Sequence, residues 1–340
     1  MRQLIVIINL LVSLIQVISC KEKNEPVPQV VAEINTNIKK WEKAVVNIEC
    51  QQLKYAPEEI NGIIETEKKQ NKFVSVQDEL LRRGALGRQT SPISGTAIYF
   101  TDQGKKYLVT AKHVIFDVLE SKGNAGQRLY KDISVRTPYD YYLKKKVNNS
   151  SIPSTGYGAT NPFYLSDDAT DIGIISLQAS FTSFLIQTLE DDGYVPINLS
   201  DIDPSPAINA GTAIATLGYP DISKIGVFEK MNDYQSNVVV LPISTFGNIA
   251  MAHERLPYFI SAITIYPGNS GGPVIRNNKL IGIVSGQVLI PVDKRDANNE
   301  STTTSSDLYS RGTLAKVIKA QYIISGLQQL QRIEENKSFH

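Results

Sequence analysis

The chain of 340 residues carries 35 Lys and Arg against 34 Asp and Glu, which leaves a formal net charge of +1 at pH 7. This balance lacks the basic surface that nucleic-acid binding requires, so we expect no nucleic-acid partner. No phosphate-binding loop, zinc signature or internal repeat is visible in the sequence, so we expect no cofactor and no metal. With 42% apolar and 8% aromatic residues, the chain can bury a sizeable core.

The first 20 residues have the pattern of a secretory signal, with Arg2 ahead of an apolar stretch from Leu4 to Ile18. The stretch ends in Val17-Ile18-Ser19-Cys20, which fits a bacterial lipobox. Cleavage before Cys20 and acylation of that residue would attach the chain to a membrane through lipid. We therefore expect a lipid-anchored protein of the bacterial cell envelope, at the outer membrane or the periplasmic face. Ordinary secretion is the alternative.

Cys50 is the second of the two cysteines in the sequence. If Cys20 is lipidated, Cys50 has no intramolecular partner for a disulfide. It also lacks the Cys and His spacing of a metal site. We expect Cys50 to be a buried free thiol.

Short alternating or apolar runs bounded by turn residues recur along the chain and predict a mostly β protein. Helical periodicity occurs from Asn71 to Arg83, inside a charged stretch that we expect to be a partly helical insertion, and from Thr313 to Leu330. The polar segment 293–306 predicts a loop. The predicted strands are Ala44 to Glu49, Gly95 to Phe100, Tyr107 to Thr110, Asp171 to Leu177, Thr212 to Leu217, Val238 to Ile243, Pro273 to Ile275 and Leu280 to Val284.

Among the three histidines, only His113 stands at the end of a predicted strand. It follows the apolar run from Tyr107 and a small polar turn, which is where a cleft-facing imidazole is expected. His253 and His340 have no such context, and we expect both at the surface. His113 is therefore the candidate general base.

Asp171 opens an apolar run that predicts a buried strand. A buried carboxylate at that place could accept a hydrogen bond from an imidazole and stabilise its protonated form. Asp167 and Asp168 lie upstream in polar sequence, so Asp171 is the better candidate for this task.

Ser270 lies in Tyr266-Pro267-Gly268-Asn269-Ser270-Gly271-Gly272-Pro273, a serine flanked by glycines. A serine hydroxyl needs a base and backbone N–H donors to act as a nucleophile, and glycines let the backbone bring such donors close to a substrate. Taken alone, this segment could be an ordinary turn.

The three candidates occur in the order His113, Asp171 and Ser270, about 60 and about 100 residues apart, and chain order distinguishes the known triad scaffolds. With their flanking segments they resemble the chymotrypsin-like, or trypsin-like, serine peptidases. The segment 262–270 looks most like bacterial members, including the high-temperature-requirement periplasmic proteases, although we expect no PDZ domain here.

The resemblance implies an all-β fold of two antiparallel β-barrels with a C-terminal helix and a partly helical N-terminal insertion. We therefore expect a signal peptide at 1–19, a tether at 20–38, a first barrel at 39–190 with the insertion at 52–90, a second barrel at 191–310, and the C-terminal helix at 311–332.

The resemblance also implies roles for the candidate residues. Ser270 would be the nucleophile, His113 the general base and then acid, and Asp171 the group that orients the imidazole. The oxyanion donors would be the N–H groups of Gly268 and Ser270, with Asn269 in the same turn. Animal digestive members carry an aspartate at the place of Asn269 that pairs with a freshly cut N-terminus, so we expect no zymogen activation of that type.

Substrate contacts follow from the same resemblance. Ser285 matches the serine beside the triad aspartate, and the edge formed by Ser285, Gly286 and Gln287 would pair with substrate backbone. Thr264 takes the position that holds an acid in trypsin, so selection of basic side chains is not expected. A pocket edged by Thr264, Ile265 and Gln287 predicts small or medium apolar side chains.

The sequence thus predicts a serine endopeptidase that cleaves peptide or protein substrates through an acyl-enzyme on Ser270. The alternative is a catalytically inactive binding lipoprotein on the same fold. The presence of all three triad residues and of the glycine-flanked serine favours the enzyme. An α/β-hydrolase is disfavoured because Ser270 is followed by Gly271-Gly272-Pro273 and a short strand rather than by a helix.

Overall fold

The computed structural model describes residues 38–87, 89–116, 129, 132–136, 149–153, 162–179, 182–204, 208–220, 242–291 and 309–337. Its contacts divide the chain into one unit of residues 1–40 and a second unit from Trp41 to His340. The predicted signal peptide with Cys20, all of the tether except Ile38, and the predicted loop at 293–306 lie outside the described residues.

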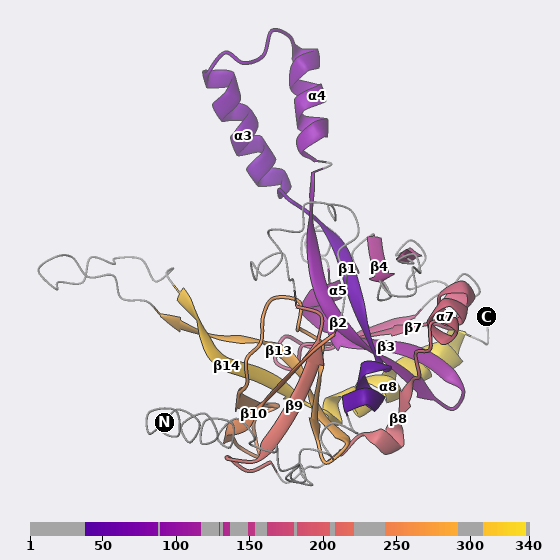
Figure 1. Ribbon diagram of the computed structural model, residues 1–340. Helices are drawn as coiled ribbons and strands as arrows, with labels where there is room; N and C mark the ends of the chain where they lie inside the picture. Colours follow the sequence, from indigo (N-terminus) through magenta and orange to yellow (C-terminus); the bar gives the residue numbers. More distant parts are fainter. Residues whose placement is uncertain are drawn as a thin grey trace, which may run out of the picture. The chain divides into compact units, whose positions relative to one another are not determined.

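Strands up to residue 198 form an eight-stranded sheet in the order β5-β4-β1-β2-β3-β7-β6, with β8 paired to β2. Figure 1 shows β1 and β2 of this sheet side by side. β3 pairs with β2 on one side and with β7 on the other, so the strand that precedes His113 lies beside the strand that follows Asp171. The strands are β1 (Val45–Leu53), β2 (Thr90–Asp102), β3 (Lys105–Ala111), β4 (Asp132–Arg136), β5 (Asn149–Pro153), β6 (Phe163–Leu165), β7 (Ile172–Ser176) and β8 (Ile197–Asn198).

The core of this sheet follows from the alternation of its strands. Val46, Ile48 and Cys50 recur at every second position of β1, and all three are fully buried in one cluster with Tyr99 and Leu108. Successive side chains of a strand point to opposite faces, so this spacing places one face of β1 in the core.

The later strands close into a six-stranded barrel in the order β10-β11-β14-β13-β12-β9. Its core contains Ile214, Phe259, Val284 and Val317, each from a different strand. The strands are β9 (Ala213–Gly218), β10 (Ile243–Ala252), β11 (Tyr258–Ala262), β12 (Pro273–Arg276), β13 (Lys279–Pro291) and β14 (Tyr309–Lys319).

The predicted all-β class is confirmed, and every predicted strand overlaps an observed strand. The strand predicted from Val238 to Ile243 does so only at Ile243. Residues 221–241 lie outside the described part of the chain, and β10 begins at Ile243.

The charged insertion contains two helices, α3 (Pro57–Lys69) and α4 (Val76–Leu86), which extend from the ends of β1 and β2 (Figure 1). The helix predicted from Asn71 to Arg83 is therefore displaced at its start. Asn71 has a left-handed backbone with φ 52°, and the Ser75 hydroxyl caps α4 by accepting a hydrogen bond from the Asp78 N–H. Ser75 sets the first turn because its side chain satisfies an N–H group that the helix leaves unpaired.

The C-terminal helix α8 (Gln321–Lys337) begins later than the 311–332 that the sequence predicted. The residues from Thr313 to Ile318 belong to β14, which pairs with β11 and β13. Ala315 and Val317 are buried in the barrel core at alternate positions, so this part of the apolar pattern has the period of a strand rather than that of a helix.

α8 packs against the first sheet rather than the barrel core. Leu327 and Leu330 are buried, and the Glu334 carboxylate accepts hydrogen bonds from Lys105 Nζ at 2.7 Å and from the Ser176 hydroxyl at 2.5 Å. Because Lys105 is on β3 and Ser176 is on β7, the helix joins the two strands that lead to the candidate base and carboxylate.

Residues 38–42 are also helical, and three further short elements are the helices α5 (Lys112–Ile115) and α7 (Ser183–Asp191) and the 3-10 helix η2 (Leu199–Asp201). Among the helices of the described residues, none combines the length and apolar character needed to cross a bilayer.

Candidate active site

Ser270 lies in a tight turn between β11 and β12, where two glycines adopt backbone conformations that other residues rarely take. Gly268 has φ 96° and Gly271 has φ 86°. A Cβ on Gly271 would lie 2.0 Å from the carbonyl oxygen of Thr96, so only glycine fits between the turn and β2. The glycines beside Ser270 thus allow a loop of the barrel to approach the first sheet closely.

Thr96 on β2 joins this turn to the first sheet, and nothing in its sequence context singled it out. Its hydroxyl donates to Gly268 O at 2.8 Å and accepts from the Tyr219 N–H at 2.8 Å. Its own N–H donates to Ser270 O at 2.8 Å, while its carbonyl oxygen accepts from the Thr110 hydroxyl at 2.7 Å. Because Thr96 is fully buried, these hydrogen bonds fix the Ser270 turn without competition from water.

The N–H groups of Gly268 and Ser270 donate no hydrogen bond to any part of the chain that the structure describes. These two predicted oxyanion donors are therefore available to a ligand. Asn269, the third residue predicted there, cannot serve as a donor through its backbone, because its N–H closes the turn by donating to Tyr266 O at 3.0 Å. Its side chain is buried, and among the described residues Asn269 Oδ1 is the one buried side-chain nitrogen or oxygen atom without a hydrogen-bond partner.

His113 is the second residue of α5, which directly follows β3, and Asp171 directly precedes β7. Asp171 Oδ2 lies 2.9 Å from His113 Nδ1, and Asp171 Oδ1 accepts a hydrogen bond from the His113 N–H at 3.1 Å. The paired strands β3 and β7 thus bring the two residues together at one end of the sheet. Asp171 is nearly buried, whereas the imidazole is half exposed.

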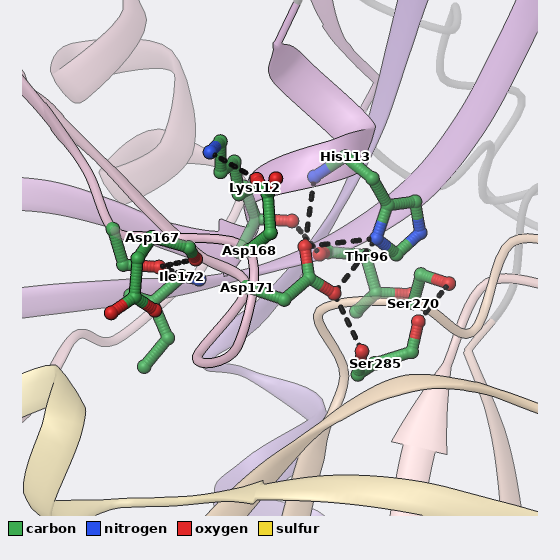
Figure 2. A network of polar contacts seen from close by, with 11 residues as sticks. Thr96, Lys112, His113, Asp167, Asp168, Asp171, Ile172, Ser270 and Ser285 are labelled. Carbon is green, nitrogen blue, oxygen red and sulfur yellow. Dashed lines mark hydrogen bonds and ion pairs between the residues drawn. The ribbon is translucent and has the colours of Figure 1, made fainter. Parts of the chain in front are cut away.

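Ser285 extends this network to the barrel (Figure 2). Its hydroxyl donates to Asp171 Oδ2 at 2.6 Å, and its carbonyl oxygen accepts from Ser270 Oγ at 3.4 Å. Among the described contacts, no hydrogen bond joins Ser270 Oγ to His113 Nε2. In Figure 2, Ser270 nevertheless lies on the side of the His113 ring that faces away from Asp171, which is the side of Nε2. A rotation of the Ser270 side chain would be needed to direct its hydroxyl to the ring.

The electrostatics of Asp171 favour its charged form. Burial by itself raises the pKa of this carboxyl, but the hydrogen bonds and positive charge of His113 and the hydroxyl of Ser285 outweigh burial and bring the pKa below its usual value. The other two candidate carboxylates have different partners: Asp167 Oδ1 accepts from Thr170 at 2.9 Å and 2.6 Å, and Asp168 pairs with Lys112. Of the three aspartates, His113 contacts Asp171.

The edge of β13 from Ser285 to Gln287 is accessible next to Ser270. β12 pairs with β13 as far as Ile283, whereas the other edge of β13 continues along β14. A Cβ on Gly286 would meet no atom within 4 Å, so there is open space beside this strand. These features agree with a strand edge that can pair with an extended peptide.

The residues predicted to form a specificity pocket are only partly brought together. Gln287 Nε2 donates to Ile265 O at 2.9 Å and to Gly312 O at 3.5 Å, and Thr264 is exposed. The Ile265 side chain, also predicted to edge the pocket, is buried in the barrel core with Val284. Alternation explains the difference, because Ile263 and Ile265 point into the core while Thr264 between them faces out.

Cys50 is a free, fully buried cysteine, as the sequence predicted. Burial, with a smaller effect from the negative charge of Glu49, raises the pKa of its thiol far above the usual range, so the reactive thiolate is suppressed. In the described ranges, no three His, Cys, Asp or Glu side chains are grouped so that they could bind a metal ion.

The family model of the trypsin-like peptidase domain matches residues 95–283, which is more than half of the chain. No curated protein matches the sequence. Among solved structures, the crystal structure of Deg5 is similar, with 12% sequence identity, a TM-score of 0.45, and coverage of 88% of this chain and 95% of that one.

Proposed function

The chain belongs to the trypsin-like peptidase family, and on this premise we propose that it is a serine endopeptidase with His113, Asp171 and Ser270 as its catalytic triad. The observation that carries the proposal is the convergence of these three residues, from the eight-stranded sheet and the six-stranded barrel, on one hydrogen-bond network. Peptide or protein substrates follow from the family.

In the acylation step, the Ser270 hydroxyl rotates toward His113, whose Nε2 accepts the Oγ–H proton as Oγ bonds to the scissile carbonyl carbon. Asp171 accepts a hydrogen bond from the Nδ1–H group of His113 and stabilises the positive charge of the ring. The N–H groups of Gly268 and Ser270 stabilise the oxyanion. His113 then returns the proton to the leaving amine as the C–N bond breaks, and the acyl group remains on Ser270.

Deacylation repeats these roles with water. His113 Nε2 accepts a proton from a water molecule as the water oxygen bonds to the acyl carbon. The carboxylic acid then forms as the ester bond to Ser270 breaks and the proton returns to Oγ. The present bond from Ser270 Oγ to Ser285 O is long, and such bonds in unliganded sites realign when a substrate binds.

Substrate would bind as an extended strand along Ser285, Gly286 and Gln287, so that backbone hydrogen bonds place its scissile carbonyl at Ser270. The side-chain amide of Gln287 forms a hydrogen-bonded bridge from β13 to Ile265 O. The bridge crosses the region that the substrate side chain before the scissile bond would enter. This bridge supports a preference for small or medium apolar side chains. A peptide library tests the preference, and dominant cleavage after Arg or Lys would contradict it.

We propose that the enzyme is anchored to the bacterial cell envelope through lipid on Cys20, with secretion as the alternative. The lipobox at 17–20 supports this proposal. Mass spectrometry of the N-terminal peptide, taken from the membrane fraction of a bacterial host, should find an acylated Cys20. The Cys20→Ala protein should leave the membrane fraction, and an unmodified mature N-terminus in the wild type would favour secretion.

Labelling with a fluorophosphonate probe tests the proposed chemistry directly, because the probe reacts with a serine that a base and an oxyanion site have activated. In the protein begun after Cys20, peptide mass spectrometry should locate the adduct on Ser270. Ser270→Ala should abolish labelling.

Labelling must also depend on the base, so His113→Ala should reduce its rate by several orders of magnitude. Absence of labelling in a wild-type protein that is folded by circular dichroism would instead support the inactive, binding-protein alternative.

A further inference from the structure

Lys112 is a buried lysine directly before the candidate base, and its charge has one described carboxylate partner. Its side chain is only 7% exposed, while that of Asp168 is 97% exposed, and the two are joined by a bond of 2.8 Å between Nζ and Oδ1. The ammonium group also lies 4.8 Å from the centre of the Phe116 ring. Lysine side chains are rarely buried unless they are paired, so this arrangement calls for a physical reason.

The loop that Lys112 contacts carries Asp171 in a strained conformation. Asp171 has φ 42°, in the left-handed region where residues other than glycine are uncommon. Its N–H donates to Asp167 O at 3.1 Å, and Asp167 Oδ1 binds the N–H and hydroxyl of Thr170. Such a backbone persists only when the surrounding contacts enforce it.

Lys112 contacts this loop at two separate points. Its backbone N–H donates to Asp171 O at 3.0 Å, and its ammonium group binds Asp168 three residues earlier (Figure 2). His113, the next residue, contacts the Asp171 carboxylate through both its N–H and its ring. The Lys112 side chain therefore ties the helix of the base to the loop of the carboxylate beyond the catalytic hydrogen bonds themselves.

We propose that Lys112, through its ion pair with Asp168, is a positioning residue that maintains the alignment of Asp171 with His113. This inference rests on the proposed triad. Without the ion pair, the 166–171 loop retains its fold, but the carboxylate samples positions that orient the imidazole less well. Small misplacements of this kind lower turnover while leaving substrate binding at the β13 edge unchanged.

The test uses Lys112→Met, which keeps an unbranched side chain at this position and leaves no buried charge. We expect kcat and the rate of fluorophosphonate labelling to fall together by roughly 10- to 100-fold, with KM within about two-fold. Asp168→Asn should have a similar effect, and Asp168→Glu, which preserves the charge at an exposed position, should restore most of the activity. The double variant Lys112→Met/Asp168→Asn should be no worse than Lys112→Met alone, because both changes remove one interaction.

Lys106 provides the matched control. It is also a lysine of the β3 region that pairs with a carboxylate, Glu190 at 3.7 Å, and lies 5.7 Å from the centre of an aromatic ring, that of Tyr99. Lys106→Met should leave kcat and labelling unchanged.

Three outcomes would overturn the inference: full activity in Lys112→Met, a loss that appears in KM alone, or an equal loss in Lys106→Met. A wild-type protein that does not label at Ser270 would refute the proposed function itself, so the two failures are distinguishable.

Discussion

The eight-stranded sheet and the six-stranded barrel contribute to the candidate site by different physical means. On the sheet side, His113 and Asp171 are aligned by side-chain hydrogen bonds and charge. On the barrel side, Ser270 is positioned by the backbone, because the turn at Gly271 packs against β2. The N–H groups of Gly268 and Ser270 in this turn donate to no described group, so they can bind a ligand. Loss of charge should therefore disable the residues of the sheet side without unfolding the protein, whereas added bulk at the turn should disable Ser270 through the shape of the backbone.

The largest effect should come from removing either of the two residues between which the proposed proton transfer takes place. Ser270→Ala or His113→Ala should each lower kcat by on the order of a million-fold, because either change prevents the proposed proton transfer. The double variant should be hardly worse than either single variant, since the two residues act as one unit. Single-turnover kinetics measure the loss, and unchanged circular dichroism and melting temperature should accompany it.

On the sheet side alone, Asp171→Asn should lower kcat by about ten-thousand-fold. The amide has nearly the same shape as the carboxylate but lacks the charge that stabilises a protonated imidazole, so the fold should persist. Steady-state kinetics with a peptide substrate measure the effect. Near-normal turnover would show that another carboxylate orients the ring, and Asp167→Asn and Asp168→Asn would then identify it.

On the barrel side, Gly271→Ala should destabilise the protein by roughly 3–5 kcal/mol, as the sum of the left-handed backbone penalty and overpacking against Thr96 O. Gly104→Ala is the matched control. Gly104 has a similar φ of 80° but no atom within 4 Å of an added Cβ, so only the backbone penalty of about 1–2 kcal/mol applies.

Urea unfolding measures both of these glycine variants, and labelling of Ser270 should be lost only in Gly271→Ala. Equal destabilisation of the two would mean that contact with β2 contributes nothing.

Thr96→Val tests the connection between the units. The change keeps the shape but leaves Gly268 O and the Tyr219 N–H without their partner, so we expect a loss of about 2 kcal/mol. Labelling of Ser270 should slow by roughly ten-fold because the turn is less well fixed. Thr101→Val is the control on the same strand, since its hydroxyl donates to Lys105 O, far from the site. Similar labelling rates in the two variants would rule out this role.

The smallest effect should appear in the pH dependence of stability. Because the pKa of Asp171 is depressed in the folded protein, its contribution is fully present above the usual aspartate pKa of about 3.9 and is lost as the pH falls through the folded value. The difference in unfolding free energy between wild type and Asp171→Asn should therefore shrink below about pH 4. A difference that is constant from neutral to acidic pH would contradict the depressed pKa.

Local patterns were sufficient to find the three candidate catalytic residues. Ser270 stands among glycines, His113 follows an apolar run, and Asp171 opens one, so each can be recognised from its own neighbours. Thr96 and Lys112 could not be found in this way. A threonine or a lysine in a strand region has many ordinary roles, and its significance here depends on partners such as Gly268 and Asp168 that are distant in sequence.

Two segments show why periodicity alone misplaced elements. The residues from Thr313 to Ile318 were included in the predicted helix, but their buried side chains alternate and they pair with β11 and β13 as a strand. Asn71 lies in a charged, helix-prone sequence, yet its left-handed backbone forms a turn and Ser75 starts the helix instead. In both places, contacts or caps outweighed a weak local preference.

The β-rich class, the glycine-flanked serine and the order of the three candidate residues can be read from residue type and local alternation alone. The contacts between distant segments cannot: Ser285 joins Asp171 to Ser270, Ile265 faces the core, and Lys112 binds the loop of Asp171. Such contacts depend on strand register and on the approach of two separately built units, which the local sequence does not encode.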